Sequence, residues 1–245
     1  MTTAIKYTFA VLLLLISQTA AEAKNYVVCV GVSDYPGEMI DLFVSHRDAE
    51  LMTNLFRRNG DAEIRCITNH DATVKNVVRA MNETYQKAGS EDAVILFFSG
   101  HGLDGGFRCY DGVLRYTTVN NCMRQSRSAR RFVYADACMS GGMRKNKRQI
   151  MEEEGGSILY FLSSRTKEPS RELPKLQQSA FTHYLANGMK GMADTNGDRV
   201  VTARELYNYV SNNVMALTDR KQHPVMWGNF TDETAVITWN RNNED

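Results

Sequence analysis

The sequence has little proline, no excess of charge and none of the short cysteine or histidine motifs that hold zinc. It has only 4 prolines in 245 residues, and 29 lysines and arginines balance 28 aspartates and glutamates to give a net charge of +1. With this balance, the overall charge favours neither nucleic acid nor anionic lipid as a partner, and any charge-based function must be local. No CxxC, HxH or HExxH spacing occurs, so no zinc site is predicted. With 43% hydrophobic and 23% charged residues, collagen, coiled-coil and disordered chains are excluded as well.

Long hydrophobic runs are confined to the first 23 residues. Lys6 supplies a positive charge, residues 9–16 are uninterruptedly apolar, and Ala21-Glu22-Ala23 fits the small-x-small cleavage pattern. The apolar run is much shorter than the roughly 20 residues that a membrane helix needs. We therefore expect residues 1–23 to be a signal peptide and residues 24–245 to form one secreted or periplasmic domain that is not held in a membrane. The alternative is a retained signal anchor.

The chain has five cysteines, an odd number for a protein expected outside the cytosol. Cys29 and Cys66 lie in strand-like runs, whereas Cys109 and Cys122 flank a turn-rich segment and could form a disulfide. Most cysteines in such positions are small buried hydrophobic residues. The sequence alone leaves the disulfide connectivity open.

Strand-like and helix-like patterns alternate through the first two thirds of the chain. Near-continuous apolar runs at 26–32, 93–99 and 131–135 are typical of strands that are buried on both faces of a parallel sheet. We expect an α/β fold with a mainly parallel sheet and helices on both faces. Further strands are expected at 63–68, 158–163 and 235–239, and helices at 45–59, 74–85, 180–190 and 202–215.

Three shorter patterns qualify this outline. Ser45-His46-Arg47-Asp48 is predicted to be a capping box that opens a helix. Residues 100–105 match GxGxxG, but the turn-like residues that follow do not predict the helix of a dinucleotide site. The polar stretches 141–156 and 165–179 are expected to be exposed loops.

A histidine and a cysteine each follow a predicted strand. His101 lies just after the run that ends at Ser99, and Cys138 lies just after the run that ends at Ala135. The carboxyl ends of neighbouring parallel strands meet at the sheet edge where α/β proteins build their sites. A cysteine nucleophile and a histidine acid–base at that edge are sufficient for peptide cleavage.

These residues stand in two motifs that resemble the caspase and metacaspase superfamily of cysteine peptidases. The motifs are Ser99-Gly100-His101-Gly102 and Asp136-Ala137-Cys138-Met139-Ser140-Gly141, and residues 26–35 and 181–209 are also similar to the family. The resemblance implies a caspase-like three-layer sandwich with a mainly parallel six-stranded sheet. It also implies that His101 is the general acid–base, that Cys138 is the nucleophile, and that backbone N–H groups of Gly102 and Cys138 form the oxyanion hole. No metal or redox cofactor is required.

Two acidic residues bear on specificity. Asp136, two positions before the cysteine, resembles the aspartate that metacaspases have there, and Asp48 resembles a second acidic pocket residue of that group. A carboxylate at the pocket floor favours arginine or lysine at P1, the substrate residue whose carbonyl is attacked. For Asp48, an interaction with the dipole of its own helix is an equal alternative.

A basic loop follows the predicted nucleophile. If the enzyme cleaves after basic residues, this flexible loop at 141–156 is a candidate for self-cleavage; a solvated loop is the alternative. The candidate sites are Arg144, Lys145, Lys147 and Arg148.

A segment near the C-terminus resembles an EF-hand loop, which makes calcium binding a second expectation. Arg199 occupies the sixth position, where the sharp turn favours glycine. A simple turn that caps a helix is the alternative. The candidate calcium ligands are Asp194, Asn196, Asp198 and Glu205.

Taken together, the sequence predicts an exported, monomeric cysteine endopeptidase that cleaves protein or peptide substrates after arginine or lysine. A caspase-fold peptidase that prefers aspartate or asparagine at P1 is the nearest alternative. The others are a catalytically idle caspase-fold module for binding or scaffolding and, less well supported, a nucleotide-binding protein.

Overall fold

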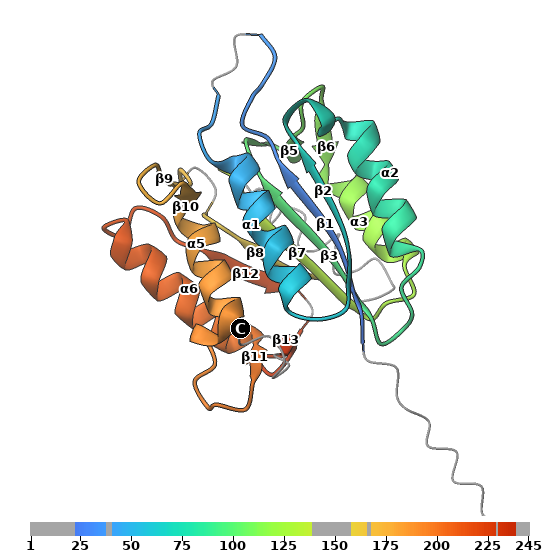
Figure 1. Cartoon of the computed structure of the whole chain (residues 1–245). Coiled ribbons are helices and arrows are strands. Elements are labelled where there is room, and N and C mark those ends of the chain that lie inside the picture. Colours follow the sequence, from blue (N-terminus) through green and yellow to red (C-terminus); the bar gives the residue numbers. More distant parts are fainter. Residues whose placement is uncertain (1–22, 38–40, 139–157, 166–167, 229, 239–245) are drawn as a thin grey trace, which may run out of the picture.

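The computed structural model describes residues 23–37, 41–138, 158–165, 168–228 and 230–238. Its centre is a six-stranded sheet with the order β12-β8-β7-β3-β1-β2 (Figure 1). All neighbours in this sheet are parallel except β12, which runs antiparallel to β8. The predicted mainly parallel six-stranded sheet is therefore confirmed. Its strands are β1 (Asn25–Gly31), β2 (Ala62–Thr68), β3 (Ala93–Ser99), β7 (Arg130–Asp136), β8 (Ile158–Leu162) and β12 (Val225–Gly228).

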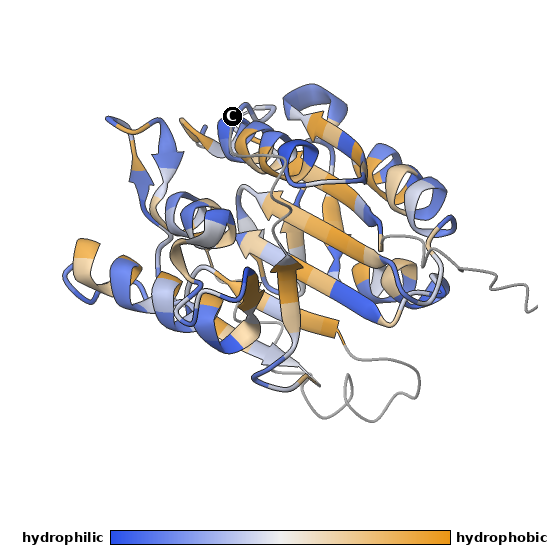
Figure 2. Ribbon diagram, turned by 60° about the horizontal axis from the view of Figure 1, so that its bottom comes forward, coloured by the Kyte–Doolittle hydropathy of each residue, from blue (hydrophilic) through white to orange (hydrophobic). Residues whose placement is uncertain are grey.

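Helices cover both faces of the sheet, as predicted. On one face α1, α5 and α6 pack against one core, and on the other α2 and α3 pack against a second core. Figure 2 shows the apolar central strands and the mixed polar and apolar surfaces of the helices. The bounds are α1 (Ser45–Arg58), α2 (Val74–Tyr85), α3 (Tyr116–Gln125), α5 (Ala180–Asn187) and α6 (Ala203–Leu217).

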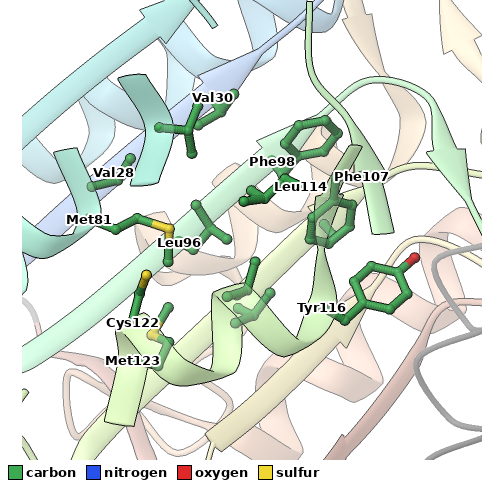
Figure 3. Packing of buried hydrophobic residues seen from close by; sticks show 14 of the residues in the cluster. Val28, Val30, Met81, Leu96, Phe98, Phe107, Leu114, Tyr116, Cys122 and Met123 are labelled. Atoms are coloured by element: carbon green, nitrogen blue, oxygen red, sulfur yellow. The ribbon is translucent and has the colours of Figure 1, made fainter. Parts of the chain in front are cut away.

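The two cores follow from the alternation of side chains along each strand. In β1, Val28 and Val30 face the core under α2 and α3, whereas Val27 and Cys29 face the core under α1. Figure 3 shows the first of these cores, where Met81 of α2 lies beside the strand residues. Every residue of β3 is buried. The strand is therefore a nearly continuous apolar run in the sequence, and this run allowed it to be predicted.

Shorter elements lie at the margins of the sheet. β4, β5 and β6 form a three-stranded sheet, β9 pairs with β10, and β11 pairs with β13. The bounds are η1 (Asn69–Asp71), β4 (Gly102–Leu103), β5 (Gly106–Arg108), β6 (Val113–Arg115), β9 (Glu172–Leu173), β10 (Gln178–Ser179), η3 (Gly188–Met192), β11 (Val200–Thr202) and β13 (Ala235–Thr238).

The strand expected at 235–239 is present as β13, which pairs with β11 outside the central sheet, whereas the sixth central strand, β12, was not predicted. Two expectations about local structure need correction. The predicted capping box at Ser45 is wrong: Val44 is the N-cap, and it makes no side-chain cap hydrogen bond. Part of the expected loop 165–179 is a hairpin of β9 and β10, in which Ser179 is buried.

The GxGxxG segment, by contrast, behaves as predicted. Its residues form β4 and the turn that leads into β5, with no helix at this point. The dinucleotide-binding geometry, in which a helix N-terminus faces a pyrophosphate, is therefore not formed by residues 100–105.

The cysteines are all free thiols in the structure. Cys29, Cys109 and Cys122 are buried, Cys138 is half-buried and Cys66 is exposed. The disulfide considered between Cys109 and Cys122 is therefore not formed. Burial of three of these thiols agrees with a role as small core residues.

Some expectations fall on residues that the structure does not describe. Almost all of the predicted signal peptide (residues 1–22) and the four candidate self-cleavage sites (within 139–157) lie outside the described ranges. Within those ranges, no helix combines the length and hydrophobicity needed to cross a bilayer.

Candidate active site

The two motifs that carry His101 and Cys138 meet at the carboxyl edge of the sheet. β3 and β7 are parallel neighbours, and their register pairs Ser99 with Asp136. His101 and Cys138 each follow two residues after this pair. The N–H of Gly100 also donates to the carbonyl of Asp136 at 3.1 Å, which extends the pairing beyond the strands. The register thus brings the two motifs side by side, as the sequence predicted.

Gly102 packs directly against the backbone of Cys138. A Cβ atom at this position would lie 1.8 Å from the carbonyl oxygen of Cys138 and 3.3 Å from Cβ of Ala137. No side chain fits at such a distance, so the close approach requires glycine. The motif that holds the histidine and the motif that holds the cysteine are therefore in van der Waals contact at Gly102.

Tyr35 fixes the backbone and the ring of His101. The N–H of His101 donates to the hydroxyl oxygen of Tyr35 at 2.9 Å, and that hydroxyl donates to the carbonyl of Arg108 at 3.2 Å. The two rings lie 4.9 Å apart, centroid to centroid. Burial raises the pKa of Tyr35, so the phenol stays protonated and remains a donor. Sequence analysis placed Tyr35 in the stretch that resembles the family but gave it no role.

Ser170 contacts the sulfur of Cys138. Its backbone N–H donates to Sγ at 3.2 Å, while the cysteine remains half-buried rather than enclosed. An N–H group that points at sulfur stabilises negative charge there, and partial exposure leaves the thiol accessible to a substrate. Ser170 lies in the segment expected to be a polar loop, where no local sequence signal marked it.

Asp136 lies at the end of β7 and is almost completely buried, with 3% of its surface exposed. Its Oδ2 accepts hydrogen bonds from the N–H of Thr182 at 3.1 Å and from the hydroxyl of Thr182 at 2.7 Å. Its Oδ1 accepts a hydrogen bond from the hydroxyl of Ser170. One residue, Ser170, therefore touches both the candidate nucleophile and the candidate specificity residue.

Asp48 is fully buried in the first turn of α1. Its Oδ1 accepts from the N–H of Ser179 at 3.0 Å, and its Oδ2 accepts from the hydroxyls of Ser179 at 2.6 Å and Ser99 at 2.9 Å. Ser99 is also the register partner of Asp136. The side chain of Asp48 thus reaches the sheet edge, beside Asp136.

The two carboxyl groups influence each other. Burial raises the pKa of Asp48 well above its usual range, and the neighbouring charge of Asp136 raises it further. Burial likewise raises the pKa of Asp136, although the hydrogen bonds from Ser170 and Thr182 oppose the rise. Two carboxylates that share a buried site resist simultaneous ionisation.

The candidate calcium loop lies elsewhere. Figure 1 places β11, at the end of this loop, near the opposite end of the sheet from the β9–β10 hairpin. Asp194 accepts hydrogen bonds from the N–H groups of Gly197 and Arg199, and Glu205 forms a capping box with Thr202. Across the described residues, no three acidic, histidine or cysteine side chains are arranged to hold a metal ion. The structure therefore gives the predicted calcium site no support, and calcium binding stays a prediction.

Comparison with known proteins agrees with this architecture. No curated protein matches the chain. The crystal structure of a protein from Geobacter sulfurreducens is similar, with a TM-score of 0.65 and 17% sequence identity over 89% of this chain and 98% of that one. At this identity the likeness shows a shared fold. A family model described as "Caspase domain" matches residues 24–235, and on the strength of that match the chain belongs to the caspase domain family, a family of cysteine peptidases.

Proposed function

We propose that the protein is a cysteine endopeptidase that cleaves after arginine or lysine. The observation that carries this proposal is the β3–β7 register, which sets His101 and Cys138 side by side beside the two buried carboxyl groups of Asp136 and Asp48. Each element of the proposed chemistry has a named group at this edge of the sheet.

The reaction follows from the positions of these groups. His101 takes the thiol proton of Cys138 as the sulfur attacks the scissile carbonyl. The thioester then forms as the C–N bond breaks and His101 donates that proton to the departing amine. In the second half, His101 takes a proton from water as the water oxygen attacks the thioester, and it returns this proton to the sulfur as the C–S bond breaks, which releases the carboxylic acid and regenerates the thiol. The N–H groups of Gly102 and Cys138, which belong to segments in contact, are the proposed donors to the oxyanion.

The preference for a basic P1 residue follows from electrostatics. Asp136 and Asp48 are buried beside each other, and each charge disfavours the other. A guanidinium or ammonium group relieves this repulsion, and a guanidinium matches carboxylate oxygens in a bidentate manner. An acidic P1 side chain would add a third negative charge, so we expect it to be rejected.

A panel of fluorogenic peptides that differ only at P1 tests this function. Cleavage is expected after arginine and lysine, with no activity in Cys138→Ala and a loss of about 100-fold in kcat/KM for arginine in Asp136→Asn, since a charge-assisted bidentate contact is lost. Circular dichroism of each variant establishes that it is folded. Cleavage after aspartate or asparagine, or cleavage that survives in Cys138→Ala, would refute the proposal.

Export and self-processing are part of the same proposal. They rest on the sequence pattern of residues 1–23 and on the basic residues Arg144, Lys145, Lys147 and Arg148 that follow the nucleophile. Intact-mass measurement of the purified protein is expected to show chain breaks after these basic residues in the wild type and not in Cys138→Ala. An intact chain in both, in a preparation that cleaves peptides, would contradict self-processing while leaving the peptidase activity in place.

A further inference from the structure

Gln222 is a fully buried polar side chain in the segment between α6 and β12. Its carbonyl Oε1 accepts a hydrogen bond from the N–H of Arg171 at 3.0 Å. Its Nε2 donates to the carbonyl of Ser163 at 3.0 Å and to the hydroxyl of Ser170 at 3.2 Å. The side chain thus ties the end of β8 to the segment that contacts Cys138, although it touches neither the cysteine nor the histidine.

The partners of Gln222 require an amide. The N–H of Arg171 can only donate and the carbonyl of Ser163 can only accept, so the orientation of the amide is fixed by its surroundings. A glutamate would keep the acceptor but would lose both donated hydrogen bonds. An apolar side chain of the same size would leave the N–H and the carbonyl without this partner.

The residues that Gln222 holds are those that contact the reacting groups. Ser170 directs its N–H at the sulfur of Cys138 and its hydroxyl at Asp136. Ser163, on the other side of the amide, accepts a hydrogen bond through its hydroxyl from the N–H of Ala137 at 3.2 Å. Two of the three hydrogen-bond partners of the Gln222 side chain, Ser163 and Ser170, therefore hold atoms of the Asp136–Cys138 segment.

We propose that Gln222 is a positioning residue that sets the reactivity of Cys138 by holding Ser170 against its sulfur. Through the same serine, it also affects how Asp136 binds a basic P1 residue. The second effect rests on the proposed function, because it requires a basic P1 residue. The first does not, because it concerns the thiol itself.

Loss of the Gln222 amide is expected to destabilise negative charge on Sγ of Cys138. Without the hydrogen bonds between Gln222 and residues Ser170 and Arg171, this segment moves, and the N–H of Ser170 no longer faces Sγ of Cys138. The thiolate then loses a donor, and a hydrogen bond to a charged group has a larger effect than one between neutral groups. The thiol should therefore react more slowly, and the turnover number should fall more than KM changes.

The decisive measurement is the alkylation rate of Cys138 by iodoacetamide, followed by site-resolved mass spectrometry across pH 5 to 10. In Gln222→Met, which keeps the volume and removes the hydrogen bonds, we expect alkylation of Cys138 to be roughly tenfold slower. Gln222→Glu should slow alkylation further, because it also adds negative charge. The matched control is Gln86→Glu at an exposed position, which should leave the profile unchanged.

Two outcomes overturn the proposal. One is a Gln222→Met protein that is folded by circular dichroism and keeps the wild-type alkylation profile. The other is additive behaviour of Gln222→Met and Ser170→Ala in kcat, since residues that act through one contact are expected to be non-additive. If Gln222→Met does not fold, Gln222→Glu and Ser170→Ala, which alters the same contact from its other side, decide the question by the same profile.

Failure of the proposed function would be recognised separately. If the wild type cleaves no peptide of the P1 panel, the peptidase proposal fails, but the alkylation profile still tests the positioning role. If the wild type cleaves after basic residues and the profile is unchanged in the folded variants, the peptidase proposal stands and the role of Gln222 is refuted.

Discussion

Asp48 and Asp136 each accept three hydrogen bonds inside the protein, yet burial raises the pKa of both. Their partners are mainly serine and threonine side chains with no formal charge. Neutral donors compensate only part of the loss of water around a carboxylate, and the second carboxylate opposes ionisation of the first. Under the proposed function, a basic P1 side chain would supply the compensating charge.

The raised pKa values predict a specific pH dependence of stability. Between about pH 4, where an unfolded aspartate ionises, and the higher pKa of the folded state, the folded protein binds more protons than the unfolded one, so stability falls as pH rises. In Asp48→Asn the stability should fall less steeply with pH, because one buried carboxyl group is gone and Asp136 no longer has a second carboxyl group beside it. Thermal melts from pH 4 to 8 measure the difference.

The exposed variant Asp219→Asn is the matched control for these melts, and it should follow the wild-type slope. Wild-type and Asp48→Asn slopes that coincide would contradict the raised pKa of the buried pair.

At the scale of elements, the start of α1 is held by a residue far away in the chain. The helix has no side-chain cap of its own. Instead, Oε1 of Glu172 in β9 accepts hydrogen bonds from the N–H groups of Phe43 at 2.9 Å and Val44 at 3.0 Å. A carboxylate at a helix N-terminus satisfies unpaired N–H groups and interacts favourably with the dipole. Glu172 thus links the β9–β10 hairpin to the helix that carries Asp48.

Replacing this remote cap should weaken the fold measurably. We expect Glu172→Ala to lower the free energy of unfolding by about 1–2 kcal/mol, as for loss of a capping side chain, and Glu172→Gln to lower it less because an acceptor oxygen remains. Urea titration followed by circular dichroism measures both. Glu83→Ala, at an exposed position of α2, is the reference, and an equal loss in it would argue against the capping role.

At the scale of the whole molecule, the site exists because two parallel strands end together. The chain passes through α3 and β4–β6 between β3 and β7, yet the register returns Asp136 to the side of Ser99. Such pairing of distant segments is specified by burial of both strand faces in the two cores, because a shift of one residue would exchange those faces. The geometry of His101 and Cys138 is thus a property of the sheet.

The contact between Gly102 and Cys138 tests whether the site depends on the close pairing of the two motif segments. In Gly102→Ala the new Cβ would collide with the carbonyl of Cys138, for which the structure gives a separation of 1.8 Å. The two motif segments must separate, which is expected to lower stability by about 1–3 kcal/mol and kcat/KM by about 100-fold. Gly89→Ala, whose Cβ would meet its nearest neighbour at 3.5 Å, is the control for denaturation and kinetics. Full activity in Gly102→Ala would disprove the close contact.

Sequence reasoning identified the elements whose signal is local. The strand β3 is buried along its whole length and was recognised from its apolar run, and His101 and Cys138 were found because each follows such a run in a motif. It failed for β12, whose run of three apolar residues in a four-residue strand is too short to be a signal, and for the predicted capping box, where Asp48 instead bonds to Ser99 and Ser179.

What the sequence alone determined is therefore the fold class, the family resemblance and the pair of candidate catalytic residues, because hydrophobic periodicity and motifs are written in neighbouring positions. Only the tertiary structure decided which polar residues complete the site. Tyr35, Ser170 and Gln222 stand in ordinary polar or loop surroundings along the chain, and they matter because folding places each beside a partner that lies tens of residues away.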